Sequence, residues 1–323
     1  MLERVALHSA LPAVSRLCLG TNMFGTAVDQ VRANALLDAF AALGGNFIDT
    51  ARSYGDWIPD APKGASERAV GAWMKGRRRQ DIVLATKGGF FDLKVMDYRK
   101  RVNPEDIASD LAESLEHLQT DYIDLYWLHT DDDTQPVGAL VDALIEHQQA
   151  GRIRQFGASN WSPARLEEAR AYAQAIGHDG FIACQPFWGL AVPNREAAAV
   201  SGYGPYYEDG FQPVHAAGLA MVPYSGQSRG FFTKLAASGE QGLPDDLKAM
   251  YVNEANRHRL AALTRVAEIH GVGLNTAALA YLTSQPHLTV PIIGASKPEQ
   301  LAESARATAL TLSAAELAAL ATA

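Results

Sequence analysis

Cysteine, long apolar runs and positive charge are all scarce in this sequence. Its 323 residues include two cysteines, Cys18 and Cys184, which lie far apart in apolar segments without metal-binding spacing. This favours two separate buried thiols over a disulfide or a metal pair, so no metal is expected. No run approaches the about 18 apolar residues that span a bilayer, and no apolar leader follows Glu3 and Arg4. We therefore expect a cytoplasmic protein with no membrane partner.

The charge balance argues against further classes of protein. Lys and Arg number 28 against 36 Asp and Glu, which gives a net charge of −8. An acidic surface disfavours nucleic acid as a partner. The hydrophobic content of 48% is ample for a core and disfavours disorder, and the length suits two domains or one large barrel.

Short apolar runs alternate with longer amphipathic segments along the chain. Eight of the runs are continuously apolar, which is typical of parallel strands buried on both faces. They cover residues 16–20, 46–50, 81–87, 122–129, 153–160, 181–186, 219–225 and 289–295.

Helices are predicted between these strands. The clearest covers 104–118, where Asn103 can cap the first turn and Pro104 suits the first helical position. The other predicted helices cover 29–42, 66–77, 137–150, 163–176, 254–269, 275–284 and 298–306. Several end at a glycine, which tolerates the left-handed conformation of a helix C-terminus.

Eight strands that alternate with helices predict a single (β/α)8 barrel domain over residues 1–323. No linker or short repeat marks a second domain. The segment 4–14 is expected to cap the bottom of the barrel, 191–215 to form a long loop, and 309–320 to form a final short helix.

Ionisable side chains stand at the ends of three predicted strands. Asp49 ends the second strand with Tyr54 in the following loop, Lys87 ends the third and His129 the fourth. Strand ends meet at one mouth of such a barrel, so these four groups are expected to lie together. Lys87 would pair with Asp49 and lower the pKa of Tyr54, while His129 could orient a carbonyl. The set suits proton transfer to a carbonyl oxygen.

These residues, in this order, resemble the aldo-keto reductases, whose catalytic tetrad is Asp, Tyr, Lys and His. The resemblance runs from about residue 16 to 306. It is carried by FIDTARSYG, LATKGG, LYWLH, GRIRQFGASNW, ACQP, VPYSGQSRG and PIIGASKPEQLAES. It implies a nicotinamide-dependent oxidoreductase that reduces an aldehyde or ketone, with Tyr54 as general acid and Asp49, Lys87 and His129 as its catalytic partners.

The resemblance also implies where the cofactor binds. Ser159, Asn160 and Gln185 would hold the nicotinamide carboxamide and Tyr224 would stack on the ring, as suits amide and aromatic groups. The full set expected to bind cofactor is Thr21, Asn22, Asp49, Ser159, Asn160, Gln185, Tyr224, Ser225, Gly226, Gln227, Ser228, Arg229, Gly294, Ala295, Ser296, Lys297 and Gln300. No GxGxxG motif supports a Rossmann mode of binding.

NADPH is expected by family precedent, with NADH as the alternative. Gln300 and Ser304 stand where many NADP-preferring members carry arginine and asparagine, which weakens the case for a 2′-phosphate. Ser296, Lys297 and Arg229 remain as the residues to hold one.

Aromatic residues shortly after strand ends are the candidate walls of the substrate pocket. They are Phe24, Trp57, Trp161, Phe187 and Trp188, together with His129. Asp131, Asp132 and Asp133 form either a solvated acidic loop or a rim that binds polyols, and Arg52 and Tyr98 are further rim candidates. This mixture favours a sugar or polyol-like carbonyl over a steroid.

Two other functions stay open. Lys87 could form a Schiff base as the nucleophile of an aldolase on the same barrel. Alternatively, the chain could be a regulatory subunit that binds the cofactor to report its redox state. The sequence predicts no oligomeric state.

Overall fold

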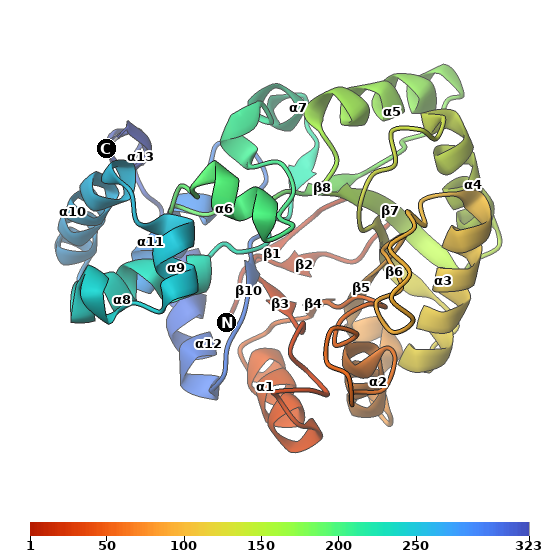
Figure 1. Cartoon of the computed structure of the whole chain (residues 1–323), viewed down its shortest axis with the longest axis horizontal. Helices are drawn as coiled ribbons and strands as arrows, with labels where there is room; N and C mark the ends of the chain where they lie inside the picture. Colours follow the sequence, from red (N-terminus) through yellow and green to blue (C-terminus); the bar gives the residue numbers. More distant parts are fainter. Residues whose placement is uncertain (323) are drawn as a thin grey trace.

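Eight parallel strands form the centre of the protein in the computed structural model, which describes residues 1–322 (Figure 1). In the order of their pairing they are β10 (Ile292–Ile293), β3 (Cys18–Gly20), β4 (Phe47–Asp49), β5 (Val83–Gly88), β6 (Ile123–Leu128), β7 (Ile153–Ser159), β8 (Ala183–Gln185) and β9 (Ala220–Met221). The segments of β9 and β10 close the ring, because the Val290 amide donates to the Met221 carbonyl at 2.8 Å. The predicted (β/α)8 barrel is confirmed.

Strands β9 and β10 contain two residues each, far fewer than the predicted ranges 219–225 and 289–295. Pro223 lies just after β9 and Pro291 just before β10. Proline has no backbone N–H, so each one removes a donor from the ladder and shortens the regular pairing.

Helices surround the strands (Figure 1). Those that correspond to the eight predicted helices are α1 (Gln30–Ala42), α2 (Ala65–Met74), α3 (Pro104–Leu118), α4 (Val137–Gln149), α5 (Pro163–Ala175), α10 (Glu254–His270), α11 (Leu274–Thr283) and α12 (Pro298–Ala305). Helix α3 has the predicted bounds, and the Asn103 side chain accepts a hydrogen bond from the Asp106 amide at 3.0 Å. Gly271 ends α10 with a φ of 61°, the left-handed conformation expected of a glycine cap.

The expectation of one long loop over 191–215 is corrected. This segment contains α6 (Arg195–Val200) and a 3-10 turn, and α7 (Gln212–Ala216) lies at its end. Two more helices, α8 (Phe231–Ser238) and α9 (Asp245–Tyr251), follow β9. Helices this short carry too few turns to show a helical period in sequence. The predicted final helix is present as α13 (Ala314–Thr322).

Two apolar layers hold the barrel together. Inside it, Phe47, Leu125 and Trp127 pack in one cluster with Leu7 and Leu11. The last two belong to the segment between β1 (Arg4–Val5) and β2 (Val14–Ser15), which pair as an antiparallel hairpin, so this segment caps the barrel as expected. A second cluster joins the outer faces of the strands to the helices.

The two cysteines, Cys18 and Cys184, are free and buried. This confirms the expectation of two separate thiols. Within residues 1–322, no helix has both the length and the apolar character that a bilayer crossing requires.

We predict that His215 makes stability fall with acidification. Tyr207 donates to its Nδ1 at 2.8 Å, its Nε2 lies 3.1 Å from the Leu288 carbonyl, and burial lowers its pKa to about 4. Between the free pKa of about 6.5 and this value, the unfolded chain binds more protons, so stability is lost as pH falls. In urea unfolding, the stability advantage of the wild type over His215→Gln should therefore be larger at pH 7 than at pH 5. An equal advantage at both pH values would contradict this assignment.

Candidate active site

The buried ammonium of Lys87 joins three parts of the barrel mouth. Lys87, on β5, pairs with Asp49 at the end of β4 and donates to the Thr50 carbonyl at 2.8 Å. It also donates to the Tyr54 hydroxyl at 2.9 Å. Asp49 accepts a second hydrogen bond from Gln185 Nε2 at 3.1 Å. Pairing of neighbouring parallel strands brings these side chains together from positions that are distant in sequence.

The pKa values of this group follow from burial and mutual charge. Burial on its own would lower the pKa of Lys87, but the charge of Asp49 and the contact with Tyr54 outweigh it, so the pKa is raised. Burial raises the pKa of Tyr54, and the negative charge of Asp49 raises it too. The positive charge of Lys87 lowers it, but by less than these two effects raise it. The expectation that Lys87 brings the pKa of Tyr54 below its free value is therefore not met. Tyr54 is a neutral phenol and Lys87 a cation.

His129 faces Tyr54 at the end of β6. The two rings lie edge to face with centroids 5.9 Å apart. The Phe90 ring also packs against His129, with the two ring centroids 4.7 Å apart. Burial lowers the pKa of His129 well below 6.5, and the positive charges of Lys87 and Arg52 lower it further. The imidazole is therefore neutral at neutral pH, so it can donate a hydrogen bond without carrying charge.

Amide and hydroxyl side chains continue from this group along the next strand ends. Ser159 donates to the Gln185 carbonyl at 3.0 Å, and Asn160 donates to the His129 carbonyl at 2.9 Å. The Tyr224 hydroxyl donates to Asn160 Oδ1 at 2.7 Å. The ring of Tyr224 stacks on Phe187 with centroids 5.6 Å apart. Each of these side chains is therefore held by a hydrogen bond to a neighbouring group.

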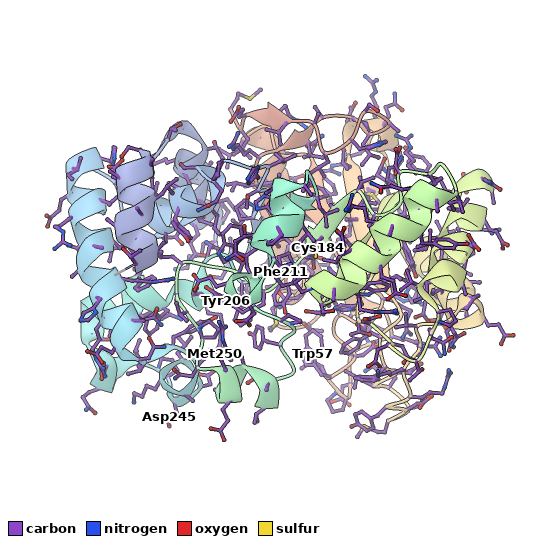
Figure 2. All side chains as sticks on the ribbon, turned by 90° about the horizontal axis from the view of Figure 1, so that it is seen from above. Trp57, Cys184, Tyr206, Phe211, Asp245 and Met250 are labelled. Carbon is purple, nitrogen blue, oxygen red and sulfur yellow. The ribbon has the colours of Figure 1, made fainter. Side chains whose placement is uncertain are left out.

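A cavity of about 960 Å³ opens over these residues. The predicted site residues that line it are Thr21, Asn22, Asp49, Tyr54, Trp57, His129, Ser159, Asn160, Gln185, Tyr224, Ser225, Gly226, Gln227, Arg229, Gly294, Ala295, Ser296 and Gln300. Lys87 lies behind Asp49 and Tyr54, Ser228 is buried, and Lys297 is exposed beside the cavity. Figure 2 places Trp57 toward the same side of the molecule as Met250 and Asp245, and Cys184 in the interior.

Four of the five aromatic residues predicted as substrate walls do not line the cavity. Phe24, Trp161, Phe187 and Trp188 are 3% exposed or less. Trp161 donates to the Thr130 carbonyl at 3.0 Å, and Trp188 stacks on Tyr207. All four rings belong to the buried cluster that joins the strands to the helices, because rings that follow a strand end can turn back into the core. Phe187 supports Tyr224 from behind.

The predicted rim residues are also corrected. Arg52 is fully buried and paired with carboxylates, so it cannot meet a substrate. Asp131 pairs with Arg165 at 3.0 Å, and Asp132 and Asp133 approach Lys100 at 3.3 and 3.2 Å. Neither these aspartates nor Tyr98 lines the cavity described above.

Sequence reasoning missed several residues that line the cavity. They include Phe90, Ser201, Tyr203, Thr233, Lys234, Asn275 and Glu303. Phe90 follows the end of β5 closely, so its place at a strand end could have revealed it. Tyr203 lies in the long segment after β8, and Asn275 lies on α11, where no local pattern signals a binding role.

Backbone strain gathers at the same cavity. Six non-glycine residues among those described have a positive φ. Asn160, Ser225 and Arg229 line the cavity, and Ser228 lies between two lining residues in sequence. Such conformations cost free energy and persist where the surrounding structure holds them, which is common at ligand sites.

Comparison with known proteins agrees with this geometry. The model of the Aldo/keto reductase family matches residues 16–323, and the chain belongs to this family. Family members are oxidoreductases that generally use nicotinamide cofactors.

Similar proteins include aldo-keto reductase ausK of Aspergillus calidoustus, at 33% identity over 96% of this chain and 78% of that protein. Norsolorinic acid reductase of Aspergillus flavus is 30% identical over 98% and 79%. The uncharacterized oxidoreductase YrpG of Bacillus subtilis is 30% identical over 93% and 89%. A solved thermostable aldo-keto reductase in complex with the inhibitor epalrestat shares the fold, with a TM-score of 0.72 at 24% identity over 99% of each chain.

Proposed function

We propose that this protein reduces an aldehyde or ketone to an alcohol with NADPH, and that Tyr54 donates the proton. The observation that carries the proposal is the contact of one buried ammonium, Lys87, with both Asp49 and the Tyr54 hydroxyl at the mouth of the cavity. A neutral phenol hydrogen-bonded to a cation is an acid whose conjugate base is stabilised in place.

The residues present fit a nicotinamide dinucleotide. Amide groups of Asn160 and Gln185, with the hydroxyl of Ser159, suit a carboxamide, and the Tyr224 ring suits a flat heterocycle. Small residues, Ser225 and Gly226, lead from there toward the N-terminus of α12, where the positive end of the helix dipole favours an anion. Such a cofactor would supply hydride to the carbonyl carbon.

The remaining chemistry belongs to the chain. His129 Nε2 and the Tyr54 hydroxyl would both hydrogen-bond the substrate oxygen and orient the carbonyl. As negative charge develops on that oxygen, Tyr54 transfers its proton. Lys87 then stabilises the phenolate, and Asp49 keeps Lys87 charged within the apolar barrel.

The substrate class follows from the end of the cavity nearest Tyr54. Trp57 and Phe90 lie there beside Tyr54 and His129. Asp49 also lines the cavity but is paired with Lys87, and the other charged lining residues, Arg229, Lys234 and Glu303, belong to other segments. We propose a neutral carbonyl with an aromatic or apolar substituent, in preference to a sugar, because the acidic residues that favoured a polyol are paired elsewhere. Several relatives are named for reduction of norsolorinic acid.

The aldolase alternative is disfavoured by the state of Lys87. A Schiff-base lysine needs a lowered pKa and a free lone pair. The pKa of Lys87 is raised, and its ammonium contacts Asp49, Thr50 and Tyr54.

One experiment tests the reductase proposal against a cofactor-sensing role. Aromatic aldehydes and ketones, aliphatic carbonyls and sugars are supplied with NADPH or NADH, and the absorbance of the reduced cofactor is followed. Consumption with the neutral aromatic substrates supports the proposal. Tight cofactor binding without turnover of any carbonyl would favour the sensing subunit.

We predict that Lys297→Ala weakens NADPH binding and leaves NADH binding nearly unchanged. Lys297 precedes α12, close to Ser296, where a 2′-phosphate would gain a charge-assisted contact. The side-chain oxygen Oε1 of Gln300 accepts hydrogen bonds from the backbone N–H groups of Ser296 and Lys297 at 2.7 and 3.2 Å. A phosphate would take the place of that oxygen as the acceptor. Loss of the contact should cost about 1.5–3 kcal/mol, which is roughly ten- to a hundred-fold in affinity. Titration by fluorescence measures both affinities, and equal losses for the two cofactors would place the phosphate elsewhere.

A further inference from the structure

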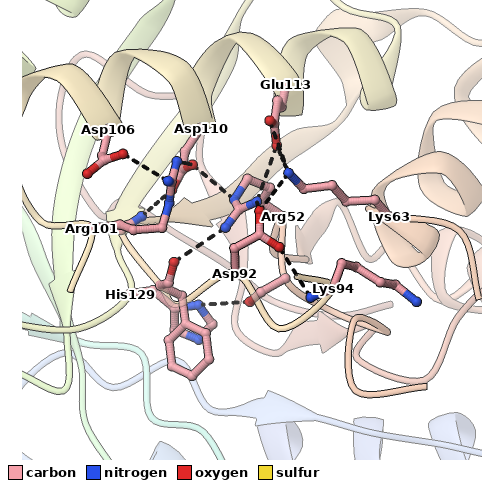
Figure 3. A network of polar contacts seen from close by, with 12 residues as sticks. Arg52, Lys63, Asp92, Lys94, Arg101, Asp106, Asp110, Glu113 and His129 are labelled. Atoms are coloured by element: carbon pink, nitrogen blue, oxygen red, sulfur yellow. Dashed lines mark hydrogen bonds and ion pairs between the residues drawn. The ribbon is translucent and has the colours of Figure 1, made fainter. Parts of the chain in front are cut away.

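Arg52 is a buried cation just two residues before Tyr54. Figure 3 shows it within a network of polar contacts that includes Asp110 and Glu113. The Arg52 side chain is 1% exposed. Its Nε lies 3.2 Å from Asp110 and its Nη1 lies 3.2 Å from Glu113, both on α3, while Asp92 lies 3.8 Å from Nη1. One guanidinium therefore ties the Tyr54 loop to α3 and to the loop that follows β5.

The same guanidinium also contacts Phe90, which packs against His129. Arg52 Nη2 donates to the Phe90 carbonyl at 3.3 Å. The Phe90 ring packs against His129 with centroids 4.7 Å apart, and Ser53, the neighbour of Arg52, lies 3.5 Å from His129 Nδ1. Arg52 is thus connected both to the backbone of Tyr54 and to the residues that contact His129.

Stability alone does not explain such a cluster. The attraction between a buried cation and its carboxylates is largely offset by the cost of removing the charges from water, so the net gain in stability is small. The planar fork of arginine, in contrast, sets the direction of several contacts at once, which the point charge of lysine cannot do. The arrangement suits a residue that holds the Tyr54 loop and the Phe90 loop at a fixed separation.

We propose that Arg52 is a positioning residue, which fixes the Tyr54 loop relative to the Phe90–His129 pair and thereby sets the placement of the Tyr54 hydroxyl. The proposal rests on the proposed function of Tyr54 as proton donor. Arg52 does not touch the cavity and acts only through its neighbours.

The first test is Arg52→Lys, which keeps the charge and removes the fork. We expect kcat to fall roughly ten- to a hundred-fold, because small displacements of a reacting group are costly in rate. The NADPH Kd should stay within about threefold, since Phe90, the cavity-lining residue that this guanidinium contacts, is assigned to the substrate end of the cavity. The matched control is Arg259→Lys, which makes the same exchange at another buried guanidinium. Arg259 pairs with Glu208 and donates to the Leu190 carbonyl, and it shares neither partner with Arg52. This variant should lose stability and keep kcat.

The second test separates positioning from general loosening of the fold. In the Tyr54→Phe background, Arg52→Lys should cause little further loss in single-turnover rate, because the hydroxyl that it positions is already gone. A full multiplicative loss in that background, or an unchanged kcat in Arg52→Lys alone, overturns the proposal. If Tyr54→Phe itself reduces carbonyls normally, the proposed function fails, which is a different outcome.

If Arg52→Lys does not fold, Glu113→Gln replaces it in the same cycle. Glu113 is one-third exposed, so its variant should fold, and it removes one of the two close charges on Arg52. We expect a loss in kcat of about threefold with Tyr54 present and none in the Tyr54→Phe background. Equal losses in both backgrounds overturn the proposal.

Discussion

Tyr54→Phe should lower kcat for carbonyl reduction by about 10²–10⁴ or more, the range that general acid catalysis contributes. The hydroxyl lies 2.9 Å from the Lys87 ammonium at the wall of the cavity, and the variant removes that proton without changing the shape of the ring. The NADPH Kd should stay within a few-fold, because the hydroxyl is assigned to the substrate oxygen. Steady-state rates and a fluorescence titration give the two values.

The matched control is Tyr126→Phe. Tyr126 is a fully buried tyrosine of β6, and its hydroxyl has no hydrogen-bond partner within the described part of the chain. Its removal should leave turnover nearly unchanged. If Tyr54→Phe kept near-normal rates, the proton would have to come from His129 or from water. If it abolished cofactor binding, Tyr54 would be a structural residue.

Lys87→Met should lower kcat by at least about 10²-fold, because the phenolate left by Tyr54 loses the cation that stabilises it. Lys87 also lowers the pKa of Tyr54 against the effect of burial, so its loss should raise that pKa further. Reduction needs the protonated phenol, and the remaining activity should therefore persist to higher pH than in the wild type. The pH dependence of kcat measures this shift.

Stability is the confounding effect in Lys87→Met. The variant leaves Asp49 buried without its partner, a change that typically costs about 3–5 kcal/mol. The double variant Asp49→Asn/Lys87→Met removes both charges and should recover much of that loss. Recovery of stability without recovery of kcat would assign Lys87 a role in the chemistry. Recovery of both would reduce it to a structural partner of Asp49.

The barrel and the group of ionisable residues at its mouth could be predicted because both depend on local, periodic signals. Continuous apolar runs mark parallel strands whatever surrounds them, and Asn103 and Pro104 define the start of α3 by backbone chemistry alone. Once the strands are in order, the barrel places strand ends at one mouth, so the proximity of Asp49 to Lys87 follows from topology.

The substrate walls could not be predicted in the same way. Trp57 and Trp161 both follow strand ends, yet one is 44% exposed at the cavity and the other is fully buried. A ring gains free energy from burial wherever there is room for it, and that room depends on loops packed from distant parts of the chain. Tyr203 reaches the cavity for the same reason, from a segment in which no pattern marked it.

The sequence by itself therefore determined the class of fold, the strand-end residues that meet at its mouth and the kind of chemistry that they suit. Tertiary structure alone decided the burial of Arg52 among Asp110 and Glu113 and the neutral state of His129. It also decided that burial outweighs Lys87 at Tyr54. A charge in water and the same charge in a barrel differ by a desolvation free energy. That free energy depends on every group packed around the charge, and the residues next to it in sequence do not determine which groups those are.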